Sequence, residues 1–158
     1  MKKNKEVQNI LVVSLNDKFS KRVACVLSEK LDMFNLDCYD MVVYDLINPK
    51  EVLEKCGLEY FQKRERGVIK SCSSYLNTCI SISFDLIYKH LELFEKSLIF
   101  YIKLPYEKIT KVPNQLDFDN RDNYLQDIAD EIVTLDKKSC NMAVNCIIEK
   151  MGEIYENN

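Results

Sequence analysis

Glycine is scarce in this chain of 158 residues, and its absence from one segment excludes a common kind of phosphate-binding site. The chain contains three glycines, and none lies in the stretch VVSLNDKFSKR (residues 12–22), which joins an aliphatic run to an amphipathic helix pattern. In a nucleotide-binding domain, such a strand-to-helix junction holds a glycine-rich loop whose backbone amides surround phosphate. The sequence therefore excludes an intact phosphate loop here. It also lacks the catalytic motifs GxSxG and HExxH.

Other scarce features exclude further classes of function. The seven cysteines form no CxxC pair, so we expect free, buried thiols in a reducing cytoplasm and no metal site. No apolar stretch approaches the roughly 20 residues that a membrane span needs. The net charge of −3 disfavours nucleic acid as a partner, since nucleic-acid-binding proteins usually present a basic face. The one histidine, His90, has no cysteine or aspartate at a useful spacing, so we expect no role for it as a base or ligand.

What the sequence does contain is an alternation of strand and helix patterns along a single domain, residues 1–158, with a flexible start at 1–8. Short aliphatic runs predict buried strands, and apolar residues spaced by three and four predict helices. The expected strands are residues 10–14, 79–83, 98–102 and 131–134, with 37–44 as either a strand or the start of a helix. The expected helices are residues 20–31, 49–56, 60–72, 85–94, 124–129 and 139–154.

Local signals refine these expectations. The pair Asn48-Pro49 predicts a helix start, with Val52, Leu53 and Cys56 facing inward and Gly57 ending the helix. Residues 112–120 contain proline, asparagine and aspartate and are expected to form a loop. Strands that alternate with helices predict an α/β three-layer sandwich with a central parallel sheet of about five strands. Ligands of such sheets bind beyond the carboxyl ends of the strands.

One segment resembles a known family. CGLEYFQKRERGVI (residues 56–69) is similar to a segment of the shikimate kinases in which a helix ends at glycine and is followed by glutamate, an aromatic pair, arginine and a second glutamate. From this anchor, LSEKL (27–31) is similar to the family's first helix, and LIFYIKLPYEKI (98–109) to a later strand and short helix. CISISFDLI (79–87) lies where the family has a strand ending in three glycines, and residues 121–151 resemble the family's closing region. The resemblance covers nearly the whole chain and implies a P-loop kinase-like fold and a family that acts in aromatic amino acid biosynthesis.

The phosphate-loop positions depart from this family. The resemblance places residues 14–21 over the motif GxxxxGK[ST], with Ser14 and Phe19 at its glycines, Ser20 at its lysine and Lys21 at the hydroxyl residue that holds Mg²⁺. A shift of register could recruit Lys18 or Lys21, but the glycines would still be missing. A bulky side chain is poorly tolerated where the loop needs positive φ, so we expect Phe19 to fill the space of the nucleotide.

The substrate-cleft positions are altered as well. Asp40 matches the family's substrate aspartate and Arg121 its last substrate arginine, although a capping aspartate and a surface arginine are the simpler interpretations. Gln62 stands where the family has an arginine. Ser83 and Asp85 lie in place of the three glycines, and Asp85 adds negative charge.

One further residue and one segment complete the comparison with the family. Glu65, which would orient the missing arginine, is retained, but on a helix surface it is expected to be solvated. The segment between the strand at Tyr101 and Arg121 is too short to hold the family's arginine-bearing lid.

These losses predict a catalytically inactive shikimate-kinase-like protein, a pseudoenzyme, that binds a protein partner or a small anionic ligand. We expect no cofactor, no nucleic-acid or membrane partner and a cytoplasmic location, with a homo-oligomer possible. Two alternatives stay open: a divergent, active small-molecule kinase that uses ATP and Mg²⁺, and a regulatory subunit of a shikimate-pathway enzyme.

Overall fold

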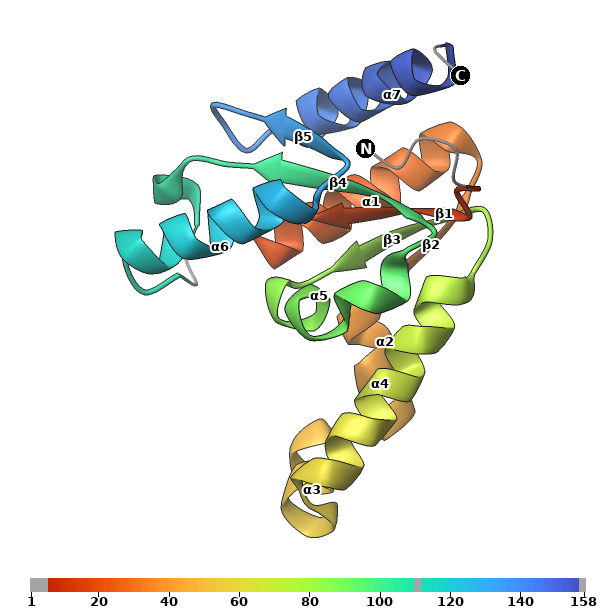
Figure 1. Ribbon diagram of the computed structural model, residues 1–158, viewed down its shortest axis with the longest axis vertical. Helices are drawn as coiled ribbons and strands as arrows, with labels where there is room; N and C mark the ends of the chain where they lie inside the picture. The colour runs from red at the N-terminus through yellow and green to blue at the C-terminus, as the bar shows by residue number, and fades with distance from the viewer. Residues whose placement is uncertain (1–5, 110–111, 157–158) are drawn as a thin grey trace.

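The computed structural model describes residues 6–109 and 112–156, in which strands and helices alternate (Figure 1). The strands are β1 (Asn9–Val13), β2 (Phe34–Asp37), β3 (Thr78–Ile82), β4 (Ser97–Lys103) and β5 (Glu131–Thr134). The α-helices are α1 (Asp17–Leu31), α2 (Cys38–Leu46), α3 (Pro49–Cys56), α4 (Leu58–Ser74), α5 (Phe84–His90), α6 (Gln115–Ile128) and α7 (Cys140–Glu156). Two short 3₁₀ helices are η1 (Leu91–Phe94) and η2 (Tyr106–Lys108).

The five strands form one parallel sheet in the order β2-β3-β1-β4-β5, which confirms the predicted α/β architecture. Strand β1 lies in the middle, and all five of its residues are buried. A parallel strand that is covered by helices on both faces is expected to be apolar throughout. The polar exception, Asn9, has its amide nitrogen 2.9 Å from the carbonyl oxygen of Ser73 and 2.8 Å from that of Tyr75, so its burial is compensated.

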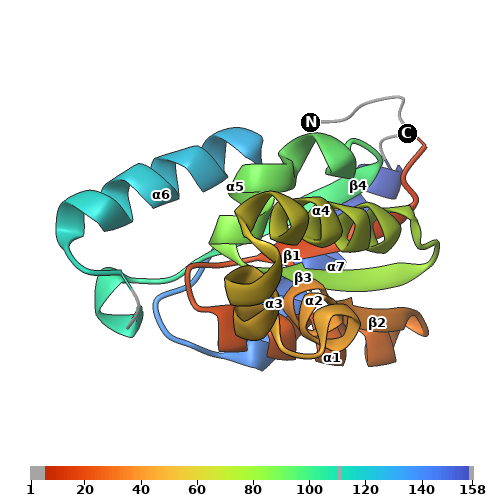
Figure 2. The same cartoon turned by 90° about the horizontal axis from the view of Figure 1, so that it is seen from below.

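The helices cover both faces of the sheet. Helices α1 and α7 pack together on one side, and α4, α5 and α6 lie on the other (Figure 2). Helix α3 and the first part of α4 extend beyond the sheet (Figure 1). At the start of the chain, residues 1–5 of the predicted flexible segment lie outside the described residues. Gln8 is held by backbone hydrogen bonds to Lys96 and Asn77.

The ambiguous segment 37–44 is helical, and the second strand lies just before it. Asp37 ends β2 and caps α2, because its side chain accepts a hydrogen bond from the amide of Asp40 at 3.0 Å. Strand β2 lies at the edge of the sheet, and its first residue, Phe34, is 73% exposed. A short edge strand of this kind has no apolar run, which is why the sequence pattern did not reveal it.

The predicted loop at residues 112–120 is wrong in its second half, because α6 begins at Gln115. Asn114 caps this helix, with its side chain accepting a hydrogen bond from the amide of Asp117 at 2.8 Å. Phe118 then packs into the core. Proline, asparagine and aspartate therefore mark a helix start here rather than a continuing loop.

Helix α3 begins after its cap Asn48 and ends at Gly57, as predicted, and Gly57 has a φ of 87°. The expected inward face is confirmed for Val52, which is half-buried and packs against the core, and is wrong for Leu53, which is 40% exposed, and for Cys56, which is exposed. None of the residues in α3 is fully buried. The reason is tertiary: α3 contacts α2 and α4 beyond the sheet, so its apolar side is only partly covered.

The cysteines are all free, but they are not uniformly buried as expected. Cys38, Cys72 and Cys79 are buried, whereas Cys56 is exposed. Burial raises the pKa of the Cys79 thiol to about 12, so this thiol stays protonated and unreactive at neutral pH. Within residues 6–109 and 112–156, no helix is long and apolar enough to cross a bilayer.

Candidate functional site

The junction between β1 and α1 is a tight turn formed by Ser14, Leu15 and Asn16. Helix α1 starts at Asp17, earlier than predicted, because Asn16 caps it. The Asn16 side-chain oxygen accepts a hydrogen bond from the amide of Phe19 at 3.1 Å. The Ser14 hydroxyl donates to the backbone carbonyl of Asn16 at 2.7 Å and fixes the turn.

This cap uses backbone amides that a phosphate loop would keep available. The amides of Phe19 and Ser20 also donate to the backbone carbonyl of Asn16, both at 3.1 Å. A phosphate loop works because successive amides point inward at the anion and have no other acceptor. At these two positions the acceptor is Asn16, so the amides of Phe19 and Ser20 are already hydrogen-bonded within the chain.

The side chains of Phe19 and Ser20 point into the protein and are 5% and 1% exposed. The Ser20 hydroxyl donates to the backbone carbonyl of Asp17 at 3.1 Å. Phe19 is helical, and the non-glycine residues with positive φ in the described ranges are Asp32, Ile47 and Asn77. Phe19 therefore does not have positive φ, because this segment is helical and does not adopt the conformation of a phosphate loop.

A cavity of about 620 Å³, the loop cavity, adjoins this turn and is lined by Phe19 among other residues. Four basic residues line it, namely Lys18, Arg22, Lys108 and Lys138. Phe19 therefore forms part of the wall of the loop cavity. Its side chain does not fill this space completely, contrary to the prediction from the sequence.

A second hollow of about 640 Å³, the charged cleft, brings together six of the residues singled out in the sequence. These are Lys18, Lys21, Asp40, Glu65, Ser83 and Asp85. They come from the first two turns of α1, the start of α2, the middle of α4 and the junction of β3 with α5. The carboxyl ends of parallel strands and the starts of the following helices meet at this edge, as expected for an α/β sheet.

Within the charged cleft, Lys21 and Asp40 form an ion pair with Nζ 2.5 Å from Oδ2. The hydrogen bond to Asp40 raises the pKa of the Lys21 ammonium above its ordinary value, against a smaller opposing effect of desolvation. Lys21 thus forms an ion pair with the Asp40 carboxylate. An ammonium group cannot bind Mg²⁺ as the hydroxyl of the motif does.

Two other predicted cleft residues do not line the charged cleft. Gln62 is exposed on α4. Arg121, on α6, has Nε 3.0 Å from Oδ2 of Asp117, and its guanidinium lies 5.0 Å from the ring centre of Phe84. Arg121 therefore contacts Phe84, whose sequence neighbours Ser83 and Asp85 line the charged cleft, but it does not line the cleft itself.

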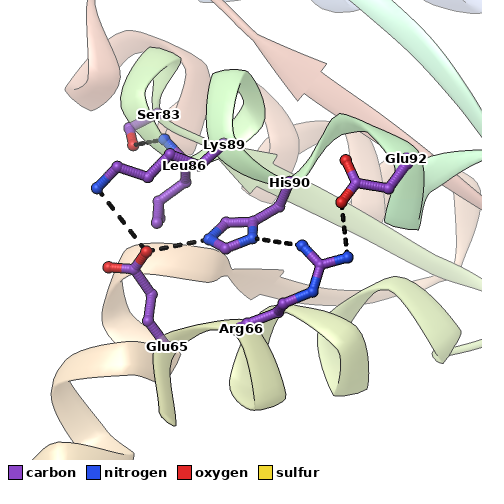
Figure 3. Close-up of polar contacts among 7 residues, drawn as sticks. All are labelled: Glu65, Arg66, Ser83, Leu86, Lys89, His90 and Glu92. Atoms are coloured by element: carbon purple, nitrogen blue, oxygen red, sulfur yellow. Dashed lines mark hydrogen bonds and ion pairs between the residues drawn. The ribbon is translucent and has the colours of Figure 1, made fainter. Parts of the chain in front are cut away.

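The charged cleft includes one residue whose environment the sequence did not predict. Glu65 is 5% exposed rather than solvated. Its Oε1 lies 3.0 Å from Nε2 of His90 and 3.9 Å from Nζ of Lys89 (Figure 3). Arg66 then contacts Nδ1 of His90 at 3.3 Å and Oε1 of Glu92 at 2.6 Å. These side chains form a chain of polar contacts from the cleft to the protein surface.

The hydrogen-bond donors around His90 define which ring nitrogen carries the proton when the ring is uncharged. A guanidinium can only donate hydrogen bonds, so Nδ1 of His90 must accept from Arg66. The uncharged ring then carries its proton on Nε2 and donates to the Glu65 carboxylate. Glu65 is thereby fixed in position by a buried donor.

Sequence reasoning missed the pair of Glu65 and His90 because they lie 25 residues apart on α4 and α5. One signal was present: Glu65 follows Phe61 by four residues and precedes Ile69 by four, which places it on the inward face of a helix. Within the ranges that the structure describes, no group of three or more histidine, cysteine, aspartate or glutamate side chains could hold a metal ion.

Comparison with known proteins identifies the fold. No family model matches the sequence. No curated protein matches it at a significant level. Among solved structures, the chain is similar to the shikimate kinase of Aquifex aeolicus, with a TM-score of 0.71 and 20% identity over 91% of this chain and 96% of that one.

Two further shikimate kinases give the same result. The enzyme of Acinetobacter baumannii, solved in complex with shikimate, has a TM-score of 0.68 and 15% identity, covering 94% of this chain and 95% of that one. The enzyme of Bacteroides thetaiotaomicron has a TM-score of 0.61 and 12% identity, covering 92% and 98%. The protein therefore has a shikimate-kinase-like fold, as the resemblance in its sequence implied. At these identities the likeness defines the fold alone.

Proposed function

We propose that this protein is a pseudoenzyme of the shikimate-kinase-like fold, which binds a ligand or partner and does not transfer phosphate. The observation that carries this proposal is the Asn16 cap, which turns the phosphate-loop segment into a tight turn and an extra helical turn. Phosphoryl transfer depends on positioning and on neutralising the charge of the transferring group. A turn whose amides at Phe19 and Ser20 are already bonded supplies neither through its backbone.

The side chains at the same segment support the proposal. The family's loop lysine is replaced by Ser20, which is buried and donates its hydroxyl to Asp17. The family's Mg²⁺-binding hydroxyl is replaced by Lys21, which is paired with Asp40. ATP and Mg²⁺ therefore do not fit this site in the manner of the family, and the proposed function includes no cofactor.

One observation favours the alternative of a divergent, active kinase. The loop cavity is lined by Lys18, Arg22, Lys108 and Lys138, whose charges could attract a polyphosphate. A nucleotide bound there would be held by side chains and not by a backbone loop.

Calorimetry with ATP and Mg²⁺ separates these two functions. We expect no binding in the micromolar range, and no ADP formation in a coupled assay with shikimate, because the phosphate-binding amides are bonded elsewhere. An active shikimate kinase measured under the same conditions is the positive control. Micromolar ATP binding that weakens in a Lys18→Ala, Lys108→Ala double variant would establish the divergent kinase in place of the pseudoenzyme.

A protein partner is favoured by a separate observation. Exposed apolar side chains gather on α2, α4 and the turn after α2, where Tyr44 is 81% exposed, Ile47 86% and Leu58 59%. Large exposed apolar groups on neighbouring elements are typical of interaction surfaces. Light scattering of the purified chain, alone and mixed with shikimate-pathway enzymes, tests this candidate and the regulatory-subunit alternative. Association that is lost in an Ile47→Asp variant would support it.

A further inference from the structure

The walls of the charged cleft combine apolar, aromatic and charged groups. Ile82 and Leu86 provide a buried apolar floor, while Tyr39 and Phe61 present aromatic rings. Tyr39 is 58% exposed, so part of its ring is available to a bound molecule. A concave site with apolar walls and a few polar groups is the usual form of a small-molecule site.

The charges that line the charged cleft are predominantly negative. Five carboxylates line it, from Asp17, Asp37, Asp40, Glu65 and Asp85, against the three ammonium groups of Lys18, Lys21 and Lys89. Two of the ammonium groups are already close to carboxylates: Lys21 is paired with Asp40, and Lys89 lies 3.9 Å from Glu65. The lining therefore carries two more negative than positive charges, and it attracts a cation more strongly than an anion.

Glu65 gives this negative cleft a buried and oriented group. It is 5% exposed, and in the described part of the chain its hydrogen bond and ion pairs all fall on Oε1. Oε2 has none of these contacts, while the residue lines the cleft. A carboxylate held on one oxygen by His90 can accept a charge-assisted hydrogen bond on the other without further ordering.

The aromatic rings reinforce the same preference. Tyr39 comes from the first turn of α2 and Phe61 from α4, and both line the cleft together with Glu65. The face of an aromatic ring attracts organic cations, and aromatic and acidic groups together are a common means of recognising ammonium. The carboxylates and the aromatic rings thus each favour the same class of ligand, a small organic cation.

We propose that the charged cleft binds a small organic cation, with its ammonium or guanidinium group directed at Glu65 and Asp85 and its carbon frame against Tyr39, Phe61 and Leu86. This inference rests on the proposed function, because it assigns a ligand class to a protein that binds without phosphorylating. It replaces the small anionic ligand expected from the sequence, since the cleft now carries Asp85 and lacks an arginine among its lining residues.

The test compares two probes that share a ring and differ in charge, cyclohexylmethylamine and cyclohexanecarboxylate, with shikimate as a third probe. Each is titrated into the ¹⁵N-labelled full chain at low salt, and the amide shifts of Tyr39 and Asp85 are followed. We expect the amine to bind at least about tenfold more tightly than the carboxylate, which corresponds to about 1.4 kcal/mol. Added salt should weaken the binding of the amine, because the attraction is electrostatic.

Two variants locate the binding, and a third is the matched control. Glu65→Gln removes the charge and keeps an oxygen that can accept from His90. Asp85→Asn removes the charge of a second lining carboxylate and keeps a side chain of the same size. Each should weaken amine binding about threefold to tenfold, because a charge-assisted hydrogen bond becomes a neutral one of about half its strength. Glu59→Gln changes an exposed carboxylate of α4 that does not line the cleft, and it should leave the affinity unchanged.

Three results would overturn the inference: equal or tighter binding of the carboxylate, no shift at the cleft with either ring compound, or amine binding that neither variant weakens. The same samples titrated with ATP and Mg²⁺ keep the two proposals apart. Binding of ATP at the loop cavity contradicts the proposed function. A preference for the carboxylate without ATP binding contradicts the ligand class alone.

Discussion

The backbone amide of Phe19 lies 3.1 Å from the side-chain oxygen of Asn16, and this hydrogen bond starts α1 at the position where related folds open a loop around phosphate. The cap lets Phe19 take a helical conformation and turn its ring into the core. One polar contact therefore shows how a segment without glycine forms a capped helix start at this junction.

The cap contributes measurably to stability. Replacement Asn16→Ala should lower the free energy of unfolding by about 1 kcal/mol, because the amide of Phe19 loses its side-chain acceptor. Asn16→Asp keeps an acceptor and should change stability little. Urea denaturation of the three proteins measures the difference, and an Asn16→Ala variant as stable as the parent would show that the cap is unimportant.

Phe19 should behave as a core residue and not as a remnant of a binding loop. Phe19→Ala is expected to lower the free energy of unfolding by about 3–5 kcal/mol, since it leaves a cavity in a packed interior. Phe34, which is 73% exposed on β2, is the matched control, and Phe34→Ala should cost less than about 0.5 kcal/mol. If Phe19→Ala does not fold, Phe19→Leu should still show a loss of about 1 kcal/mol by urea denaturation. Equal effects at the two positions would contradict the packing of Phe19.

The ring of His90 should carry its proton on Nε2 when uncharged. Long-range ¹⁵N correlation spectra distinguish the two ring nitrogens, and we expect Nδ1 to have the shift of an unprotonated acceptor. Arg66→Met removes the donor to Nδ1 and should change these shifts. Arg64→Met, two residues earlier on α4, removes only an ion pair with Asp45 and should leave the shifts unchanged. A protonated Nδ1 in the uncharged ring would show that Arg66 does not donate to it.

The free energy of unfolding should fall at alkaline pH because of the buried hydroxyl of Tyr101. Burial, and next the 2.6 Å hydrogen bond to Asp122, raises the pKa of the Tyr101 hydroxyl well above its ordinary value of 10.0. The folded protein thus retains the phenolic proton that the unfolded chain releases, so this contribution to stability is complete below pH 10 and is lost as the pH rises toward the folded value.

Tyrosinate absorbance during an alkaline titration measures this effect. Tyr101 should ionise only with unfolding, as a late step of the titration. Tyr101→Phe should remove this late step, whereas Tyr44→Phe, at an 81% exposed position, should leave it unchanged. Ionisation of Tyr101 before unfolding would contradict the burial.

Local patterns in the sequence were sufficient for the order of strands and helices. Four of the five strands, the helix start at Asn48 and the helix end at Gly57 follow from apolar periodicity and capping residues, which act within a few neighbouring positions. The sequence does not predict the edge strand β2, because none of its four residues is buried and they form no apolar run. It does not predict the start of α6, because the asparagine that caps this helix is equally common in loops.

The sequence by itself determined that no glycine-rich phosphate loop exists between residues 12 and 22, because the required residues are absent whatever the fold. It also determined the α/β architecture, since alternating strand and helix patterns admit few other arrangements. Only the tertiary structure decided which side chains meet: that Lys21 pairs with Asp40, that Glu65 is buried against His90, and that α3 is only partly covered by its neighbours. These contacts join residues far apart in the chain, and no local pattern encodes how two elements pack against each other. The chemistry of the charged cleft is therefore a property of the packing.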